Sequence, residues 1–194
     1  MKVFIVYCHP SKDSFTNEVK ESFISGLEKA GHNYIVSDLY EMNFNGEMTE
    51  NEYIREAYYR KEFPLPDDVL SEHEKINTSD AIVFIYPVFW SDVPAKLKGW
   101  FDRVWTYGFA YGENRSMKLL EKGLVLCVAG NTAEYFESTG LGEAMSKVFL
   151  DDRFFDRVKS KEMIILGETS RETSARELNR QKHLLKAYDA GAGL

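Results

Sequence analysis

The segment Ala81-Ile-Val-Phe-Ile-Tyr86 decides the fold of this 194-residue chain, because it is the most apolar stretch in it. Its β-branched and aromatic residues show no polar alternation, which is typical of a central strand buried on both faces. A helical stripe of apolar residues follows and is expected to belong to the core or to a subunit interface. The stripe consists of Val93, Leu97, Trp100, Phe101, Val104 and Trp105.

The alternation of strand and helix continues in both directions from this unit. Further strands are expected at 2–8, 34–36, 124–129 and 163–166, and further helices at 15–27, 69–76 and 174–188. The expected buried helix faces are Val69, Leu70, His73 and Ile76, and Leu178, Gln181, Leu185 and Tyr188. Gly31 fits a helix C-cap, and Ser174-Ala-Arg-Glu177 fits a capping box. The pattern predicts an α/β fold, with a parallel sheet covered by helices on both faces.

The whole chain, 1–194, is expected to form a single domain, because its length suits one core better than two. Residues 40–66 interrupt the alternation, since they are polar and rich in Tyr, Glu and Asn. We interpret them as an excursion over the surface that contains one helix, around Glu50–Arg60.

Composition and charge disfavour several classes of partner. The formal net charge of −7 disfavours nucleic acid and anionic membrane surfaces. No apolar stretch approaches the roughly 20 residues that span a bilayer, so no membrane insertion is expected. Two cysteines, Cys8 and Cys127, make no disulfide framework, which favours a reducing compartment and a cytoplasmic location. The histidines lack metal-binding spacing, and no metal site is expected.

The loop after the first strand is the first candidate binding segment, since ligands of parallel sheets lie beyond the carboxyl ends of the strands. It runs His9-Pro-Ser-Lys-Asp-Ser-Phe-Thr-Asn17 and combines hydroxyls, an amide and a helix start. Such a helix N-terminus suits a phosphate group. Without a Walker or GxGxxG motif, a monophosphate such as that of FMN fits better than ATP or a dinucleotide. The alternative is a helix capped by Ser14 or Asp13 and nothing more.

The loop after the central strand is Pro87-Val-Phe-Trp-Ser91 and places two aromatic residues in a turn. A core needs no such residues there, whereas a flat heterocycle needs apolar walls. The alternative is a cap on the core or a subunit contact. Ser91 or Asp92 is expected to cap the following helix, with Pro94 in its first turn.

The loop after the strand at 124–129 contains Gly130 and Asn131, which tolerate unusual backbone angles. Their N–H groups are expected to converge and to stabilise negative charge on a reduced flavin ring. An ordinary tight turn is the alternative. Tyr135, further along, is a candidate donor to a flavin or substrate oxygen, or else a half-buried surface aromatic.

Several motifs in one order resemble the NAD(P)H dehydrogenase (quinone) family, the flavodoxin-like group that includes DT-diaphorase. The most specific is Val93-Pro-Ala-Lys-Leu-Lys-Gly-Trp-Phe-Asp-Arg-Val104, which is similar to the family's VPAxLKGWF stretch and the acidic residue, Arg and Val after it. Gly108-Phe-Ala-Tyr-Gly112 resembles its GFAYG, and Pro87-Val-Phe-Trp90 resembles its Pro-x-x-Trp flavin loop. His9-Pro10 with Ser14-Phe15 matches its first loop. The match runs from about Val3 to Gly130.

The resemblance implies a flavodoxin-like three-layer sandwich around a five-stranded parallel sheet of order 2-1-3-4-5. It also implies a homodimer with the site near the interface. The residues that it assigns to the flavin phosphate are His9, Ser14, Phe15, Thr16 and Asn17. Those assigned to the isoalloxazine ring are Pro87, Val88, Phe89, Trp90 and Ser91, and those assigned to its pyrimidine edge are Val128, Ala129, Gly130 and Asn131.

The activity that the resemblance implies is transfer of two electrons from NAD(P)H, through the flavin, to a quinone or similar aromatic acceptor. FMN is expected rather than FAD, because the C-terminal extension of the larger FAD enzymes is missing. Two alternatives stay open: a regulatory flavoprotein subunit of a potassium efflux transporter, and a flavodoxin-like electron carrier.

The chain departs from the family pattern after the fourth strand. Where the family has Thr-Thr-Gly-Gly, this chain has Val128-Ala-Gly-Asn131, so two hydroxyls and one glycine are lost. Tyr135 matches the tyrosine of the DT-diaphorase Tyr–His pair and is the tentative catalytic residue. The position of its histidine partner falls near Leu141, so that proton relay is not expected here.

Overall fold

A single parallel sheet organises the computed structural model, which describes residues 1–170 and 176–194. The five strands follow the order β2-β1-β3-β4-β5, and every neighbouring pair is parallel. Their bounds are β1 Lys2–Tyr7, β2 Asn33–Asp38, β3 Ala81–Pro87, β4 Leu120–Val128 and β5 Val158–Leu166. The predicted fold class and strand order are therefore confirmed, and β4 and β5 begin four and five residues earlier than predicted.

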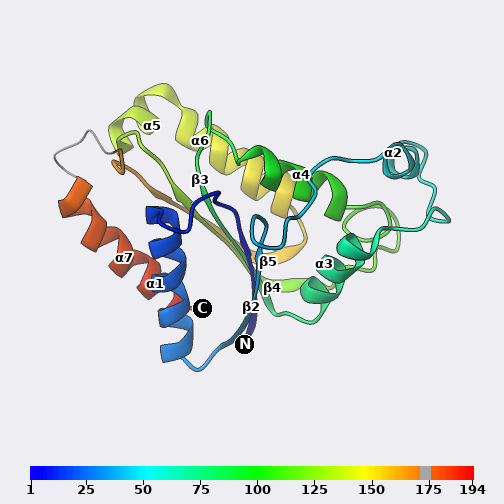
Figure 1. Ribbon diagram of the computed structural model, residues 1–194, viewed down its shortest axis with the longest axis horizontal. Coiled ribbons are helices and arrows are strands. Elements are labelled where there is room, and N and C mark those ends of the chain that lie inside the picture. The colour runs from blue at the N-terminus through cyan, green and yellow to red at the C-terminus, as the bar shows by residue number, and fades with distance from the viewer. Residues whose placement is uncertain (171–175) are drawn as a thin grey trace.

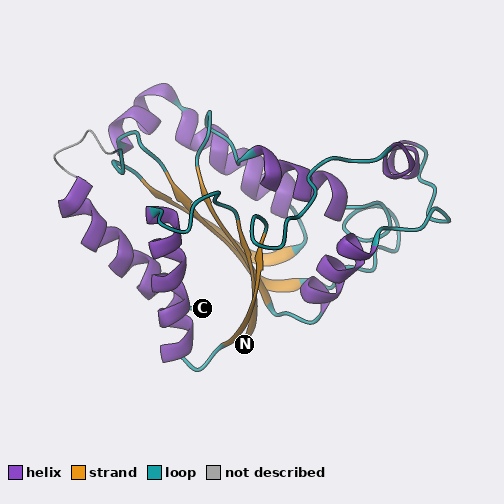
Figure 2. Cartoon of the chain, in the orientation of Figure 1, coloured by secondary structure: helices purple, strands orange, loops and turns teal. Residues whose placement is uncertain are grey.

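Helices connect the strands and cover both faces of the sheet (Figures 1 and 2). Their bounds are α1 Phe15–Lys29, α2 Glu50–Ala57, α3 Asp67–Asn77, α4 Ala95–Val104, α5 Ala133–Thr139, α6 Leu141–Ser146, the π-helix η1 Lys147–Phe154 and α7 Arg176–Ala192. The segment α5–α6–η1 was not predicted. Short helices and a π-helix do not repeat their apolar residues at the α-helical period, so the segment shows no stripe in the sequence.

Alternate residues of each central strand feed two separate cores. In β1, Phe4 and Val6 face the layer of α4 and η1, where Trp100 and Phe149 are fully enclosed. Val3 and Ile5 face the opposite layer, which α1 and α7 complete. The stripe on α4 is therefore core, as one of its two interpretations held: Trp100, Phe101 and Val104 are buried. Cys8 and Cys127 are buried and unpaired.

Helix α7 packs on α1 through small residues, and the buried face predicted for it is wrong. Leu178 and Leu185 are 80% and 61% exposed, whereas Ala187 is fully buried. A Cβ added to Gly26 would lie 2.1 Å from the carbonyl oxygen of Tyr188, so the two backbones touch there. Close backbone contact requires glycine and alanine at the interface, and it leaves Leu178 and Leu185 facing outward. Ser174, from the predicted capping box, lies outside the described residues.

The excursion between β2 and α3 stands away from the sheet and carries α2, near its predicted position (Figure 1). Arg103 on α4 anchors it: the guanidinium donates to Glu52 on α2 (2.7 Å) and to both carboxylate oxygens of Asp68 on α3 (2.6 and 3.0 Å). It also donates to the carbonyl oxygen of Asn45 (2.7 Å). Leu70, predicted to be buried on α3, is exposed.

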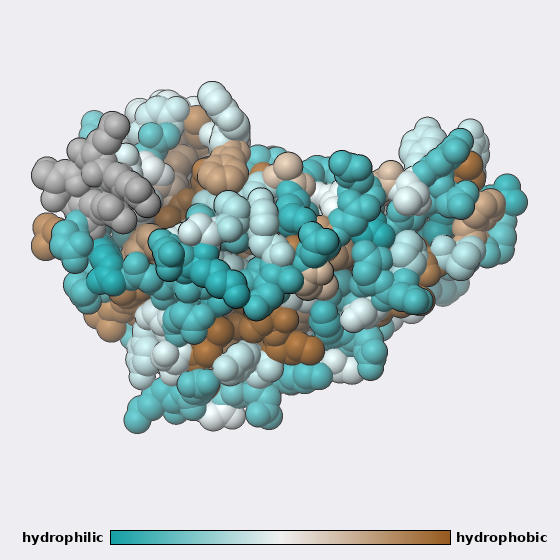
Figure 3. Space-filling view, in the orientation of Figure 1, coloured by the Kyte–Doolittle hydropathy of each residue, from teal (hydrophilic) through white to brown (hydrophobic). Residues whose placement is uncertain are grey.

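The two edge strands differ in character. β5 presents four consecutive exposed residues, Lys159, Ser160, Lys161 and Glu162, whereas the Ile35 and Val36 side chains of β2 are half-buried. Figure 3 shows hydrophobic side chains gathered near the position of β2, on a face that is otherwise mostly hydrophilic. Within the described ranges, no helix is both long and apolar enough to cross a bilayer.

Candidate functional site

The three loops singled out by sequence follow neighbouring strands and leave the sheet at one rim. Tyr7 of β1 pairs with Ile85 of β3, and Pro87 of β3 pairs with Val128 of β4. The N–H of Val88 donates to the carbonyl oxygen of Val128 (2.8 Å), which ties the second loop to the third. The topology therefore brings together the carboxyl ends at which α/β sheets bind ligands.

The first loop ends in a free helix N-terminus. Ser14 is the N-cap of α1, and its hydroxyl accepts from the N–H of Asn17 (3.1 Å). Within the described part of the chain, the N–H groups of Phe15 and Thr16 make no hydrogen bond. Two backbone donors and the positive end of the helix dipole are therefore available to an anion.

A buried hydroxyl lies beneath this N-terminus. Tyr7 is 2% exposed, and its Oη has no hydrogen-bond partner among the described residues. Burial raises the pKa of Tyr7 to about 12, although the nearby Ser14 side chain acts to lower that pKa. A buried and unsatisfied hydroxyl is uncommon in folded proteins, so this one marks a position where a further polar group fits.

His9 shapes the same loop from within. Its Nδ1 lies 2.9 Å from the backbone nitrogen and 3.0 Å from the carbonyl oxygen of Ser11, so the imidazole is held against the backbone of this loop. Burial lowers the pKa of His9 below its usual value, although its contact with the Ser11 backbone acts the other way. A neutral His9 therefore braces this loop through Nδ1.

The second loop is a tight turn in an uncommon conformation. Phe89 and Asp92 exchange two backbone hydrogen bonds of 3.0 Å, and the residues between them, Trp90 and Ser91, have φ of 53° and 59°. Two positive φ values in a two-residue hairpin define a type I′ turn, which favours Asn and Gly rather than Trp and Ser. The turn holds the Trp90 side chain fully in solvent and leaves Phe89 about half exposed.

The carboxylate of Asp92 fixes the base of this turn. Its Oδ1 accepts from the N–H of Val93 (2.7 Å) and from Nη2 of Arg153 on η1 (3.0 Å). The prediction that Ser91 or Asp92 caps α4 is wrong, since Pro94 occupies the N-cap position and no side chain caps that helix. The turn takes both residues away from the helix start.

Replacing Ser91 by glycine is expected to raise the free energy of unfolding by about 0.5–1 kcal/mol, because glycine adopts a positive φ without the steric cost of a Cβ. Chemical denaturation of both proteins measures the change. The matched control is Gly140→Ala, at a residue with φ of 70° and open space around its Cβ position, which should destabilise by a similar amount. A Ser91→Gly protein less stable than the parent would show that the turn is not strained.

The third loop offers backbone donors, but not through the backbone angles predicted for it. Neither Gly130 nor Asn131 is among the described residues with positive φ. The N–H of Ala129 is bonded to the carbonyl oxygen of Leu166 (2.9 Å), and Val128 is buried. The N–H groups of Gly130 and Asn131 have no hydrogen-bond partner in the described ranges, and both residues are exposed. The third loop thus has two backbone donors available to a ligand.

Tyr135 lies in the first turn of α5, which Thr132 caps by accepting from the Tyr135 N–H (3.1 Å). Its side chain is 41% exposed and its ring meets that of Phe136 edge to face. Leu141, at the position where the resemblance places a histidine, packs against the core. Tyr135 thus lies near the third loop. Leu141 has no group that transfers protons, so it cannot serve as the relay partner of Tyr135.

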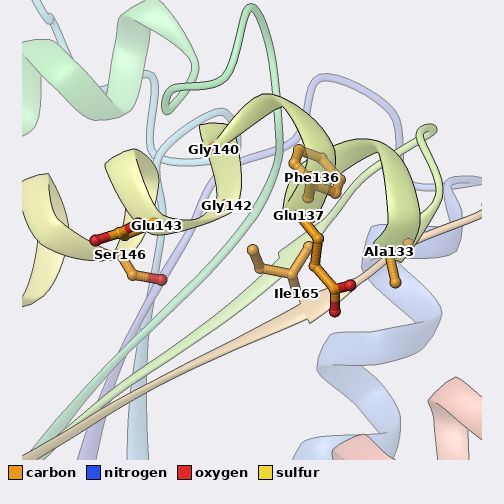
Figure 4. Close-up of a pocket in the computed structure, with 9 residues that line it drawn as sticks. Ala133, Phe136, Glu137, Gly140, Gly142, Glu143, Ser146 and Ile165 are labelled. Atoms are coloured by element: carbon orange, nitrogen blue, oxygen red, sulfur yellow. The ribbon is translucent and has the colours of Figure 1, made fainter.

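Two cavities adjoin the rim, and sequence reasoning missed most of their residues. One, of about 480 Å³, lies between α5, α6 and the end of β5, with Phe136 and Ile165 along it and Glu137 and Glu143 beside it (Figure 4). The other, of about 250 Å³, lies behind the Trp90 turn against Phe149 and Arg153. Most of the missed residues come from the unpredicted α5–η1 segment, which carries no motif. Among the described residues, no cluster of side chains is suited to hold a metal ion.

Comparison with known proteins places this geometry in a family. The flavodoxin-like fold family model matches residues 1–188. The ribosyldihydronicotinamide dehydrogenase (quinone) of Rattus norvegicus is 37% identical over 158 residues, which cover 72% of this chain and 68% of that protein. The structure of an NAD(P)H:quinone oxidoreductase from Methanothermobacter marburgensis is 48% identical, with a TM-score of 0.93 over 100% of this chain and 95% of that one.

The fold is also shared with more distant proteins. The structure of an FMN-dependent NADH-azoreductase from Bacillus anthracis in complex with FMN is 16% identical, with a TM-score of 0.72 over 99% of this chain and 98% of that one. The family-model match spans nearly the whole chain, and the rat relative exceeds a third identity over most of it. The chain therefore belongs to the flavodoxin-like fold family and is a relative of the NAD(P)H:quinone oxidoreductases.

Proposed function

We propose that this protein is a flavin-dependent NAD(P)H oxidoreductase that reduces quinones or similar aromatic acceptors by two electrons. The observation that carries the proposal is the convergence of three loops at one rim. One loop supplies a free helix N-terminus, the second an exposed Trp90, and the third two unpaired N–H groups. The helix N-terminus suits a phosphate, the exposed Trp90 suits a planar ring, and the two N–H groups suit a ring edge that carries negative charge.

The first loop fits a flavin phosphate. The N–H groups of Phe15 and Thr16 supply two donors and the Ser14 hydroxyl a third, while the helix dipole supplies partial positive charge without a lysine. The unsatisfied Tyr7 Oη below them gives the loop a further polar group. His9 and Asn17 complete the set that we assign to the phosphate.

The second and third loops fit the ring. Trp90 and Phe89 form an apolar wall that solvent reaches, and Pro87, Val88 and Ser91 complete the turn that holds it. The donors at Gly130 and Asn131 suit a carbonyl edge that gains negative charge on reduction. Val128 and Ala129 support them from the end of β4.

A flavin held by these loops would supply the redox chemistry, namely hydride acceptance from NAD(P)H and transfer of two electrons to the acceptor. The chain's own contribution is to orient the ring, offer an apolar surface to one face of it and stabilise charge at its carbonyl edge. To Tyr135 we assign the donation of a hydrogen bond to the acceptor oxygen. FMN is our choice over FAD, because the first loop suits a single phosphate.

We further propose that the protein is a cytoplasmic homodimer. The excursion supports the second part of this proposal, because it presents Tyr53, Tyr58 and Tyr59 with 59–66% of each side chain exposed. Tyrosines that are both rigid and amphipathic are enriched at protein interfaces. Analytical ultracentrifugation of the purified protein tests the assembly.

The purified protein is expected to bind FMN, and anaerobic addition of NADH or NADPH should bleach the flavin absorbance, which a quinone then restores. Ser14→Gly should weaken FMN binding by about tenfold, because it removes one hydrogen bond to a charged phosphate. Glycine still serves at an N-cap, so the helix changes little. The control, Ser25→Ala on the same helix, should leave FMN affinity unchanged. A protein that takes up neither FMN nor FAD would overturn the proposed function.

A further inference from the structure

The cavity behind the Trp90 turn shares only Trp90 and Ser91 with the residues assigned to the flavin. Its remaining lining comes from the end of β3, from Asp92 and from the α6–η1 segment, and its volume is about 250 Å³. That volume falls just below the roughly 300–1,000 Å³ of pockets that hold drug-sized ligands, so a single-ring molecule is the right size.

Tyr86 lines this cavity from the end of β3. The residue is 1% exposed overall, and its hydroxyl is not among the buried unpartnered atoms of the described residues, so that oxygen is open to the cavity rather than enclosed. Burial raises the pKa of Tyr86 well above its usual value, and the charges of Arg153 and Asp92 act on it from nearby. The hydroxyl therefore stays protonated, and its O–H can donate to a ligand oxygen in the cavity.

Arg153 gives the cavity a cation with donors to spare. Its side chain is 8% exposed and lies over the rings of Phe101 and Phe149, at 5.1 and 5.3 Å from their centres. Among the described residues, Nη2 alone of its guanidinium nitrogens has a hydrogen bond, to Asp92 at 3.0 Å. Asp92 is about half exposed and shares its charge with the Val93 N–H, so it does not occupy the rest of the guanidinium.

The walls of the cavity are apolar and suit an aromatic ring. Phe149 stacks on Tyr86 with an interplanar angle of 10°, and Met145, Ala144 and Val148 continue the surface along α6 and η1. Trp90 stands at the mouth. A planar ligand with an anionic oxygen at one end therefore meets apolar contacts along its body and two donors at its head.

We propose that this cavity is a binding site for a small aromatic carboxylate, whose ring lies against Phe149 and Met145 and whose carboxylate meets Tyr86 and Arg153. Guanidinium groups match carboxylates in geometry and charge. The site does not need the flavin. Because its mouth is the Trp90 turn, the ligand lies next to the loop assigned to the flavin ring.

Titration calorimetry with benzoate tests the site in protein with and without FMN. Benzoate is expected to bind at one saturable site, at equal affinity in both forms, and to quench Trp90 fluorescence. Tyr86→Phe keeps the ring and removes only the hydroxyl, so it should weaken benzoate binding about fivefold, while Arg153→Met should weaken it more than tenfold. Benzyl alcohol, which has the ring without the charge, should bind at least tenfold more weakly than benzoate.

Each opposite result overturns the site. Absence of benzoate binding, an unchanged affinity in Tyr86→Phe, or displacement of benzoate by FMN would each do so, the last by placing benzoate on the flavin loops instead. Ser14→Gly, which alters the phosphate loop, should leave benzoate affinity unchanged. If the protein bound no flavin at all, the titration of the flavin-free form would still decide this proposal separately.

Discussion

Replacing Arg103 by methionine is expected to lower the free energy of unfolding by about 3–5 kcal/mol, the usual cost of removing one partner from a buried ion pair. Arg103 is 4% exposed and Glu52 is 5% exposed, so the loss leaves a carboxylate in a site that water hardly reaches. Methionine retains the apolar stem over Phe44, so the change isolates the charge. Urea denaturation followed by circular dichroism measures the difference.

The pKa values of Glu52 and Asp68 also indicate that Arg103 stabilises their charged carboxylates. Burial raises the pKa of Glu52, but hydrogen bonds from Thr49 and Arg103 outweigh it and hold that pKa below its usual value. The same balance, with Arg103 as partner, lowers the pKa of Asp68.

Matched variants separate this ion pair from surface charge. Lys98→Met, on the same helix, removes the partner of exposed Asp102 and should change stability by less than about 1 kcal/mol. Adding Glu52→Gln to Arg103→Met should recover part of the loss, because the buried charge is then gone. A loss below about 1 kcal/mol in Arg103→Met would mean that Thr49 alone satisfies Glu52.

Lowering the pH from 7 to 5 is expected to cost roughly 2 kcal/mol of stability through His73 alone. Burial lowers the pKa of His73 to about 4, helped by the charge of Arg55 and opposed by the hydrogen bond to the carbonyl oxygen of Val104. The folded-state pKa thus lies below the unfolded value of 6.5. The unfolded chain takes up the proton first, so the contribution is complete above about pH 6.5 and is lost as the pH falls toward 4.

His73→Gln tests this directly, since glutamine can still donate to the Val104 carbonyl but does not titrate. The parent should lose about 2 kcal/mol more than the variant between pH 7 and pH 5, measured by urea denaturation at each pH. Glutamine also loses the stacking on Phe109, whose ring centre lies 3.5 Å away, so the variant should be less stable at pH 7. Parallel pH profiles for the two proteins would rule His73 out as the titrating group.

The sheet could be predicted from sequence because its strands are buried on both faces. Ala81–Tyr86 has no polar residue, and burial of this kind leaves a continuous apolar run that few other structures produce. The buried face of helix α7 could not be predicted in the same way. Its interface with α1 depends on backbone contact at Gly26, and small residues give no stripe.

Some features of the candidate site could likewise be predicted from the sequence, and others could not. Loops after strands follow from topology, so the positions of Ser14, Trp90 and Asn131 at one rim could be expected. The conformation of the Trp90 turn could not, because Trp and Ser give no signal for a type I′ turn. The contact between Arg153 and Asp92 could not be predicted either, since it depends on the π-helix η1, which brings Arg153 close to a residue far from it in the sequence.

The charged outer edge of β5 opposes association of this protein through its sheet edge at high concentration. Lys159 and Lys161 stand along an edge whose backbone groups would otherwise accept a further strand. Lys159 is paired with Glu121 and Lys161 with Asp151. A neighbouring copy that docked a strand there would have to bury these charged side chains, which opposes fibrous association. The other edge of the sheet is β2, which contains no lysine. Pairing with a strand of a second copy would therefore begin at Asn33–Asp38.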